Sequence, residues 1–164
     1  MPLFLAEQGA VVECVDKSPA KRTFPNTDDW NGWGFLDYGR LHPNITAYNC
    51  GIEEFGFAAL YDAIYSVGCL AHLPRHVRED TFARCRDRLL PGGITLHAID
   101  VIRSSDFLWN RCEGRELEAP VRHGTVGDVA DQLASLGFHI NEYRIIRSIP
   151  DARTDLLLIA GTLR

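Results

Sequence analysis

The residues best suited to chemistry lie in one short run, where an apolar strand gives way to a turn. Residues 61–66 are expected to form a buried strand of a parallel sheet, because Ala63, Ile64 and Tyr65 make a short apolar block between polar residues and Gly68. Pro74 then begins a helix. Ligands of open α/β sheets bind beyond the carboxyl ends of the strands, so residues 66–72 are expected to face a ligand. His72 could act there as a general base for a hydroxyl or an amine, since an imidazole titrates near neutral pH.

Two strands are predicted ahead of this run. Residues 2–9 begin with Pro and end with Gly, as the last turns of a helix do, and residues 10–16 follow as a strand of β-branched side chains that closes on Asp16. Residues 45–50 predict the second strand, and residues 51–57 form its exit loop. The chain therefore opens on a helix and a strand, without the strand that usually comes first in an α/β fold.

A helix is predicted over residues 75–90, with Phe82, Cys85 and Leu89 on one apolar stripe. Its arginines lie largely elsewhere and alternate with acids, one pair of which has helical spacing, Asp80 and Arg84. This pattern favours a solvated face over a phosphate-binding one. The arginines are Arg75, Arg78, Arg84, Arg86 and Arg88.

The second half of the chain predicts one more helix and three strands. The helix begins at Thr125, carries an apolar face and ends at Gly137. Residues 94–101 form a strand after a Pro-Gly-Gly break, and residues 138–147 and 155–161 form two more around a Pro-Asp turn. The unbroken apolar run in the last of these predicts a strand that is buried on both faces.

Residues 23–44 are rich in turn formers and aromatic side chains, and they predict a long loop. Loops of this length are uncommon unless they bind something or pack as a lid. The favoured interpretation is that the aromatic rings hold the loop onto the domain, and the alternative is a substrate lid or a partner surface. The chain is expected to be one domain over residues 1–164, with residues 23–44 as an insertion.

The composition limits the classes of function that this protein is expected to have. With 164 residues, 46% of them hydrophobic and 24% charged, the chain is long enough for one domain with a core. The net charge of −5 gives no electrostatic basis for nucleic-acid binding. Five widely spaced cysteines argue against a disulfide framework, and no membrane-spanning or signal segment is visible, so a cytoplasmic location is expected. A small molecule or an acceptor on another protein is the expected partner.

Taken in order, several of these features resemble class I S-adenosylmethionine-dependent methyltransferases. They are the strand that ends at Asp16, the loop at Gly51, the Ser-Val-Gly-Cys-Leu-Ala-His-Leu turn, the Leu-Leu-Pro-Gly-Gly corner, and the closing helix with its two strands. The resemblance implies a Rossmann-like, doubly wound α/β fold. Its sheet would be mostly parallel, with an antiparallel C-terminal strand. It also implies S-adenosylmethionine as the cofactor.

The resemblance assigns ligand contacts to residues in the first third of the chain. Asp16 corresponds to the acid that holds the ribose hydroxyls, with an acidic cap for a following helix as the alternative. Gly51 and Ile52 correspond to the loop that frames the adenine. The family's Asp is absent from that loop, which leaves Ile52 and backbone groups to hold the base, and Glu53 as a further candidate.

The resemblance also places Ser66 and Gly68 beneath the methionine part of the cofactor, where glycine lets the backbone approach a ligand. Methyl transfer from a sulfonium mainly requires that donor and acceptor be aligned, and no metal is implied. A histidine at the position of His72 is often structural in the family, so catalysis by His72 is one of two alternatives.

The first strand of the family and its glycine-rich loop have no counterpart before Asp16, where no Gly-x-Gly occurs. The expected fold therefore lacks its first, central strand, as an N-terminally truncated product would. Two unpaired strand edges beside such a gap would favour a homo-oligomer.

Two other function classes remain open from the sequence. One is a non-catalytic module of the same fold, a remnant or a partner subunit, which accounts for the missing loop. The other is an NAD-dependent oxidoreductase, because an acid near the position of Asp16 also binds ribose in that fold. The Leu-Leu-Pro-Gly-Gly corner and the paired terminal strands argue against the oxidoreductase.

Overall fold

A computed structural model describes residues 1–16, 41–70, 73–102, 124–147 and 154–164. The chain forms two compact units, Met1–Gly56 and Phe57–Arg164. The predicted aromatic loop over residues 23–44 lies almost wholly outside the described residues. No helix among the described segments has the length and apolar character that crossing a lipid bilayer requires.

The first unit contains one helix and two parallel strands. They are α1 (Pro2–Glu7), β1 (Val12–Asp16) and β2 (Ile45–Asn49), and all three were predicted to within a few residues. The small core of the unit is made by Ala6, Val12, Cys14 and Ile45. Parallel pairing brings the carboxyl ends of both strands to the same edge, so that Asp16 lies opposite Asn49.

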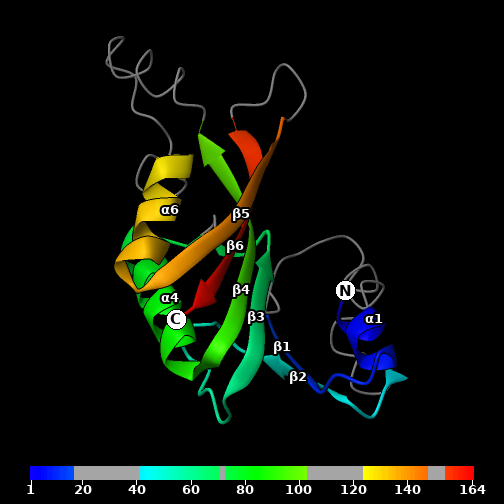
Figure 1. Ribbon diagram of the computed structural model, residues 1–164. Helices are drawn as coiled ribbons and strands as arrows, with labels where there is room; N and C mark the ends of the chain where they lie inside the picture. The colour runs from blue at the N-terminus through cyan, green and yellow to red at the C-terminus, as the bar shows by residue number, and fades with distance from the viewer. Residues whose placement is uncertain (17–40, 71–72, 103–123, 148–153) are drawn as a thin grey trace, which may run out of the picture. The chain divides into compact units, whose positions relative to one another are not determined.

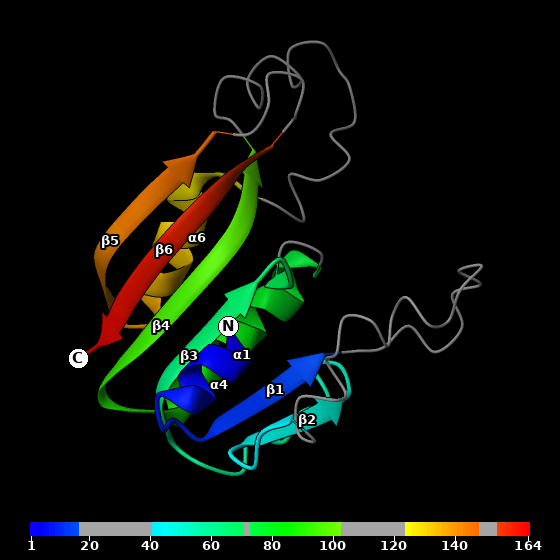
Figure 2. The ribbon, with the colours of Figure 1, turned by 90° about the vertical axis from the view of Figure 1, so that its right-hand side faces the viewer.

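The second unit is built on a four-stranded sheet. Its strands are β3 (Tyr61–Val67), β4 (Leu89–Ile102), β5 (Phe138–Ile146) and β6 (Thr154–Leu163), in the order β3-β4-β6-β5. β3 is parallel to β4, and β6 is antiparallel to both of its neighbours (Figure 2). The predicted α/β fold with an antiparallel C-terminal strand is therefore confirmed.

Two helices, α4 (Arg75–Arg88) and α6 (Val126–Ser135), lie on the same side of this sheet (Figure 1). The start of α6 is fixed by a capping box, because the Asp128 amide donates to Thr125 Oγ1 at 3.3 Å and the Thr125 amide donates to Asp128 Oδ2 at 2.8 Å. The hydrogen bond from the Thr125 backbone amide is the main reason that the pKa of Asp128 is lowered. Apolar side chains of both helices and of three strands form the core, among them Phe82, Val129, Leu133, Ile99, Leu157 and Ile159.

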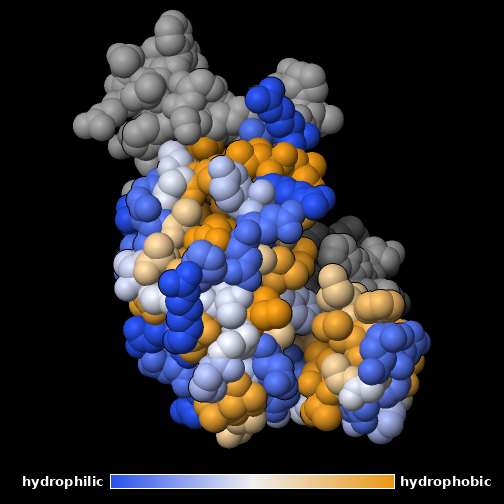
Figure 3. Space-filling view, viewed as in Figure 1, coloured by the Kyte–Doolittle hydropathy of each residue, from blue (hydrophilic) through white to orange (hydrophobic). Residues whose placement is uncertain are grey.

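The opposite face of the sheet is only partly covered in the described residues. Along β4, Thr95 is completely buried on the helix side, whereas Ile94 and Leu96 are 47% and 43% exposed on the other. Apolar surface is visible over the strands in the space-filling view (Figure 3). The prediction that the last strand is buried on both faces is therefore wrong, because α4 and α6 cover only one face. Leu157 is fully buried, and its neighbour Leu158 is half-buried.

β3 also differs from its predicted burial. It pairs in parallel as expected, but it lies at the edge of the described sheet, with Ala63 exposed and Val67 67% exposed. β1 likewise has one neighbour among the described strands. A further strand beside either edge stays a prediction.

Arg78 contradicts the prediction that the arginines of α4 lie on a solvated face. Its side chain is completely buried, and its Nε donates to Oε1 of Gln132 on α6 at 3.1 Å. A single helix cannot reveal this contact, since the partner lies 54 residues away. Arg75, one turn earlier, is exposed and pairs with Glu79 at 2.8 Å, as a solvated residue was expected to do.

Candidate functional site

The first group of predicted site residues lies at the carboxyl edge of β1 and β2. Asp16 ends β1 with an exposed side chain, and within the described part of the chain its carboxylate has no hydrogen-bond or ion-pair partner. A carboxylate at a strand end can accept hydrogen bonds from two neighbouring hydroxyls. The position of Asp16 is thus compatible with its predicted role.

Gly51 begins a tight turn just beyond β2. Its carbonyl oxygen accepts from the amides of Glu54 and Phe55 at 3.0 and 3.1 Å. A Cβ at Gly51 would lie 2.5 Å from the carboxyl group of Glu53, so that a larger residue would displace this side chain. Ile52 follows in the turn, half-buried. The ring of Phe55 packs against Tyr48 at 5.0 Å and anchors the turn on the strand.

The second group lies at the carboxyl end of β3. Ser66 is opposite His97 of β4, and Ser66 Oγ is 2.8 Å from His97 Nδ1. The other ring nitrogen, Nε2, is 2.5 Å from Oγ1 of Thr95, two residues earlier on the same face of β4. Three polar side chains therefore form a continuous chain from the buried sheet face to the strand end.

His97, the titratable member of this hydrogen-bonded group, is deeply buried. It is 1% exposed, and its ring packs against Phe82 with centroids 5.0 Å apart. Burial lowers the pKa of His97 to about 3, because the apolar surroundings disfavour the imidazolium. His97 is therefore neutral at physiological pH, and one of its ring nitrogens donates while the other accepts.

Gly68 follows β3 in a conformation that favours glycine. Its φ is +63°, a region that residues with a Cβ rarely adopt. No atom of the described residues lies within 4 Å of the position that a Cβ would take, so the backbone conformation, rather than crowding, calls for glycine here. The Gly68 amide donates to the carbonyl of Ala98 at 3.2 Å and holds the turn to the end of β4.

The structure thus places the predicted residues in two local groups. Asp16, Gly51 and Ile52 belong to the first unit, and Ser66 and Gly68 belong to the second. His72 lies outside the described residues, so its predicted role as general base stays a prediction. Within each group, the residues gather at the carboxyl ends of parallel strands, as expected from the fold class.

Sequence reasoning missed His97 and Thr95. The signal available was the Thr-x-His spacing on a predicted strand, which puts both side chains on one face. That spacing alone does not name Ser66 as the partner, because the register between β3 and β4 comes from the folded sheet.

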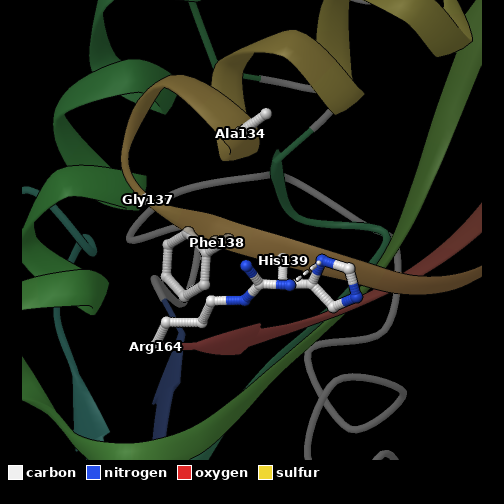
Figure 4. A pocket seen from close by; sticks show the side chains of 5 residues that line it. All are labelled: Ala134, Gly137, Phe138, His139 and Arg164. Atoms are coloured by element: carbon white, nitrogen blue, oxygen red, sulfur yellow. Dashed lines mark hydrogen bonds between the residues drawn. The ribbon is translucent and has the colours of Figure 1, made fainter.

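An open hollow lies at the other edge of the sheet of the second unit. It is lined by Ala134, Gly137, Phe138, His139 and Arg164, and Arg164 reaches the ring of His139 at 3.0 Å (Figure 4). β5 begins at Phe138 and runs parallel to β4, so this hollow lies at the amino ends of these strands. It is far along the sheet from Ser66 and belongs to no predicted site.

Comparisons with protein-family models and with curated proteins find no match to this sequence. Comparison with solved structures does find similar folds. Magnesium protoporphyrin IX methyltransferase from Synechocystis, solved with bound S-adenosylhomocysteine, is similar over 99% of this chain and 68% of its own, with a TM-score of 0.68 and 12% identity.

Two other solved structures are similar in the same way. The 1,6-didemethyltoxoflavin-N1-methyltransferase of Burkholderia thailandensis has a TM-score of 0.65 and 17% identity over 98% of this chain and 64% of its own. The N-methyltransferase NodS of Bradyrhizobium japonicum has a TM-score of 0.62 and 18% identity over 92% of this chain and 72% of its own. This chain therefore spans about two thirds of the length of the first two, and its fold is that of class I methyltransferases.

Proposed function

We propose that this chain binds S-adenosylmethionine and takes part in methyl transfer to a small-molecule or protein acceptor. The observation that carries the proposal is that nearly the whole chain matches the methyltransferase fold. The matches to three solved methyltransferases span 92% to 99% of this chain. The gathering of the predicted residues at the carboxyl ends of parallel strands supports it.

In the proposed site, Asp16 accepts hydrogen bonds from the two ribose hydroxyls. Its exposed carboxylate at the end of β1 supports this role, because no described side chain competes for its oxygens. Ile52 and the backbone of the turn that begins at Gly51 contact the adenine. The turn that follows β2 supports these roles, since its Gly51 carbonyl is already used internally and the turn is held in one shape.

Ser66 and Gly68 line the methionine end of the cofactor in this proposal. S-adenosylmethionine supplies an electrophilic methyl group on a sulfonium, and the protein holds the acceptor in line with it. Orientation of this kind can contribute roughly 7 to 11 kcal/mol to lowering a barrier. The glycine conformation at Gly68 supports a close approach of backbone to ligand. His72 would take the proton from a hydroxyl or amine acceptor.

Calorimetric titration with S-adenosylhomocysteine and with NAD tests the proposal. Binding of S-adenosylhomocysteine alone is the expected result. Binding of NAD alone would replace the proposal by an oxidoreductase, and binding of neither would favour a non-catalytic module of the same fold. Incubation with labelled S-adenosylmethionine and candidate small molecules or proteins then tests transfer itself.

A further inference from the structure

The burial of Thr95 determines which groups donate and which accept in the hydrogen bonds that link Thr95, His97 and Ser66. Thr95 is completely buried, and in the described part of the chain its hydroxyl has one hydrogen-bond partner, His97 Nε2. A buried hydroxyl that donates to no acceptor is costly, so the Thr95 hydrogen goes to Nε2. Nε2 must then be the bare, accepting nitrogen.

The protonation state of Nδ1 follows from that of Nε2. A neutral imidazole has one N–H, and His97 is neutral because burial lowers its pKa to about 3. With Nε2 accepting, the hydrogen lies on Nδ1, which donates to Ser66 Oγ over the distance of 2.8 Å. Ser66 therefore accepts from His97 and does not need its own hydrogen for this contact.

The Ser66 hydroxyl can therefore donate its hydrogen to another group. Among the described residues, Ser66 Oγ has no hydrogen-bond partner besides His97, and its side chain is only half-buried. Had the imidazole carried its hydrogen on Nε2, Ser66 would have donated to Nδ1 and would have offered a ligand lone pairs alone. The buried Thr95 thus decides what kind of group Ser66 presents at the end of β3.

We propose that Thr95 and His97 are positioning residues that fix the Ser66 hydroxyl as a hydrogen-bond donor toward a carboxylate oxygen of the ligand. The inference rests on the proposed function, in which the carboxylate is that of the amino-acid end of the cofactor. A hydroxyl that already accepts a hydrogen bond is polarised, and this strengthens its donation to an anionic oxygen. The carboxylate of an acceptor substrate offers the same chemistry, so the test separates the two sources.

The first experiment measures the tautomer of His97 in the ligand-free protein. Histidine is labelled with ¹⁵N, and long-range proton–nitrogen correlation spectra are recorded at neutral pH, with the His97→Gln variant assigning the signal. The expected result is a neutral ring with its hydrogen on Nδ1. A hydrogen on Nε2, or a charged ring, overturns the inference and leaves the proposed function untouched.

Variants then test whether Thr95 sets this tautomer. Thr95→Val removes the donor to Nε2 and keeps the side-chain shape, so the fraction of Nδ1–H is expected to fall. Thr81→Val is the matched control, because Thr81 is buried on α4 and its hydroxyl donates to the carbonyl of Val77. An unchanged tautomer in Thr95→Val, or an equal change in Thr81→Val, contradicts the positioning role.

Binding measurements identify the source of the carboxylate. Ser66→Ala is expected to weaken S-adenosylhomocysteine about 10-fold or more, the usual effect of a hydrogen bond to a charged group. It should leave unchanged the affinity for 5′-methylthioadenosine, which lacks the amino-acid end, and Ser66→Thr should restore binding. An equal loss for both ligands, or no loss for either, overturns the assignment to the amino-acid end. Failure of the unaltered chain to bind either ligand would instead contradict the proposed function, while the tautomer remains a separate result.

Discussion

Arg78 and Gln132 join the two helices of the second unit, with Arg78 Nε donating to Gln132 Oε1 at 3.1 Å. Both side chains are buried, at 0% and 8% exposure. Burial lowers the pKa of Arg78, the charge of Arg75 lowers it further, and Glu79 and Asp128 act in the opposite direction. The contact thus holds a charged group inside the helix layer, close to the capped start of α6.

Removal of this buried contact is expected to destabilise the fold. Arg78→Ala leaves a cavity and an unsatisfied Gln132 oxygen, so the free energy of unfolding should fall by about 2 to 4 kcal/mol. Arg75→Ala is the control, since its exposed pair with Glu79 is worth about 0.3 to 0.5 kcal/mol. Urea denaturation measures both, and a similar loss in the two variants would contradict the structure of this contact.

The two faces of β4 should respond differently to truncation. Ile99→Ala removes a fully buried side chain and should lower the free energy of unfolding by about 2 to 5 kcal/mol. Leu96→Ala, at a 43% exposed position of the same strand, should cost less than about 1 kcal/mol. A large loss in Leu96→Ala would mean that the open face of the sheet is covered in solution.

His97 should make the fold sensitive to acid. Its pKa is lowered from 6.5 to about 3, so between these values the unfolded chain binds a proton that the folded chain does not. Stability from this group is unaffected above pH 6.5 and decreases as the pH falls toward 3, by up to about 1.4 kcal/mol per pH unit.

Urea denaturation between about pH 7.5 and pH 5 measures this slope, because carboxylates of ordinary pKa stay largely ionised there. The His97→Gln variant has a side chain that does not titrate, so its stability should change much less over the same range. Equal slopes in both proteins would show that the pKa of His97 is the same in the folded and the unfolded chain.

Asp16 is expected to contribute to cofactor affinity. Asp16→Ala should weaken S-adenosylhomocysteine binding by about 1.5 to 3 kcal/mol, the range for hydrogen bonds to a charged acceptor. Asp62→Ala serves as the control, because Asp62 is an exposed acid near the amino end of β3. Calorimetric titration compares the variants, and an unchanged affinity in Asp16→Ala removes this residue from the site.

His72 is expected to act in turnover rather than in cofactor binding. If it is the general base, His72→Ala should lower the rate of methyl transfer roughly 100-fold or more and leave the affinity for S-adenosylhomocysteine intact. His76→Ala, an exposed histidine at the start of α4, should change neither quantity. Lower stability with normal turnover in His72→Ala would support a structural role.

The sequence by itself determined the elements whose signals are local. The helix before Gly137 was predicted from its cap and its apolar stripe, and the capping box at Thr125 explains why that signal was sufficient. β1 was predicted from a run of β-branched residues that ends at Asp16. These signals depend on neighbours a few residues away, so they can be read without the rest of the chain.

Only the tertiary structure decided which distant residues meet. The register of β3 on β4 pairs Ser66 with His97, and the packing of α6 on α4 buries Arg78, which the helix pattern had placed in solvent. Within the described segments, α4 and α6 cover one face of the sheet, and Leu158 is half-buried within an unbroken apolar run. Burial and pairing depend on contacts across 31 residues for Ser66 and His97 and 54 for Arg78 and Gln132, and residue type alone does not encode them.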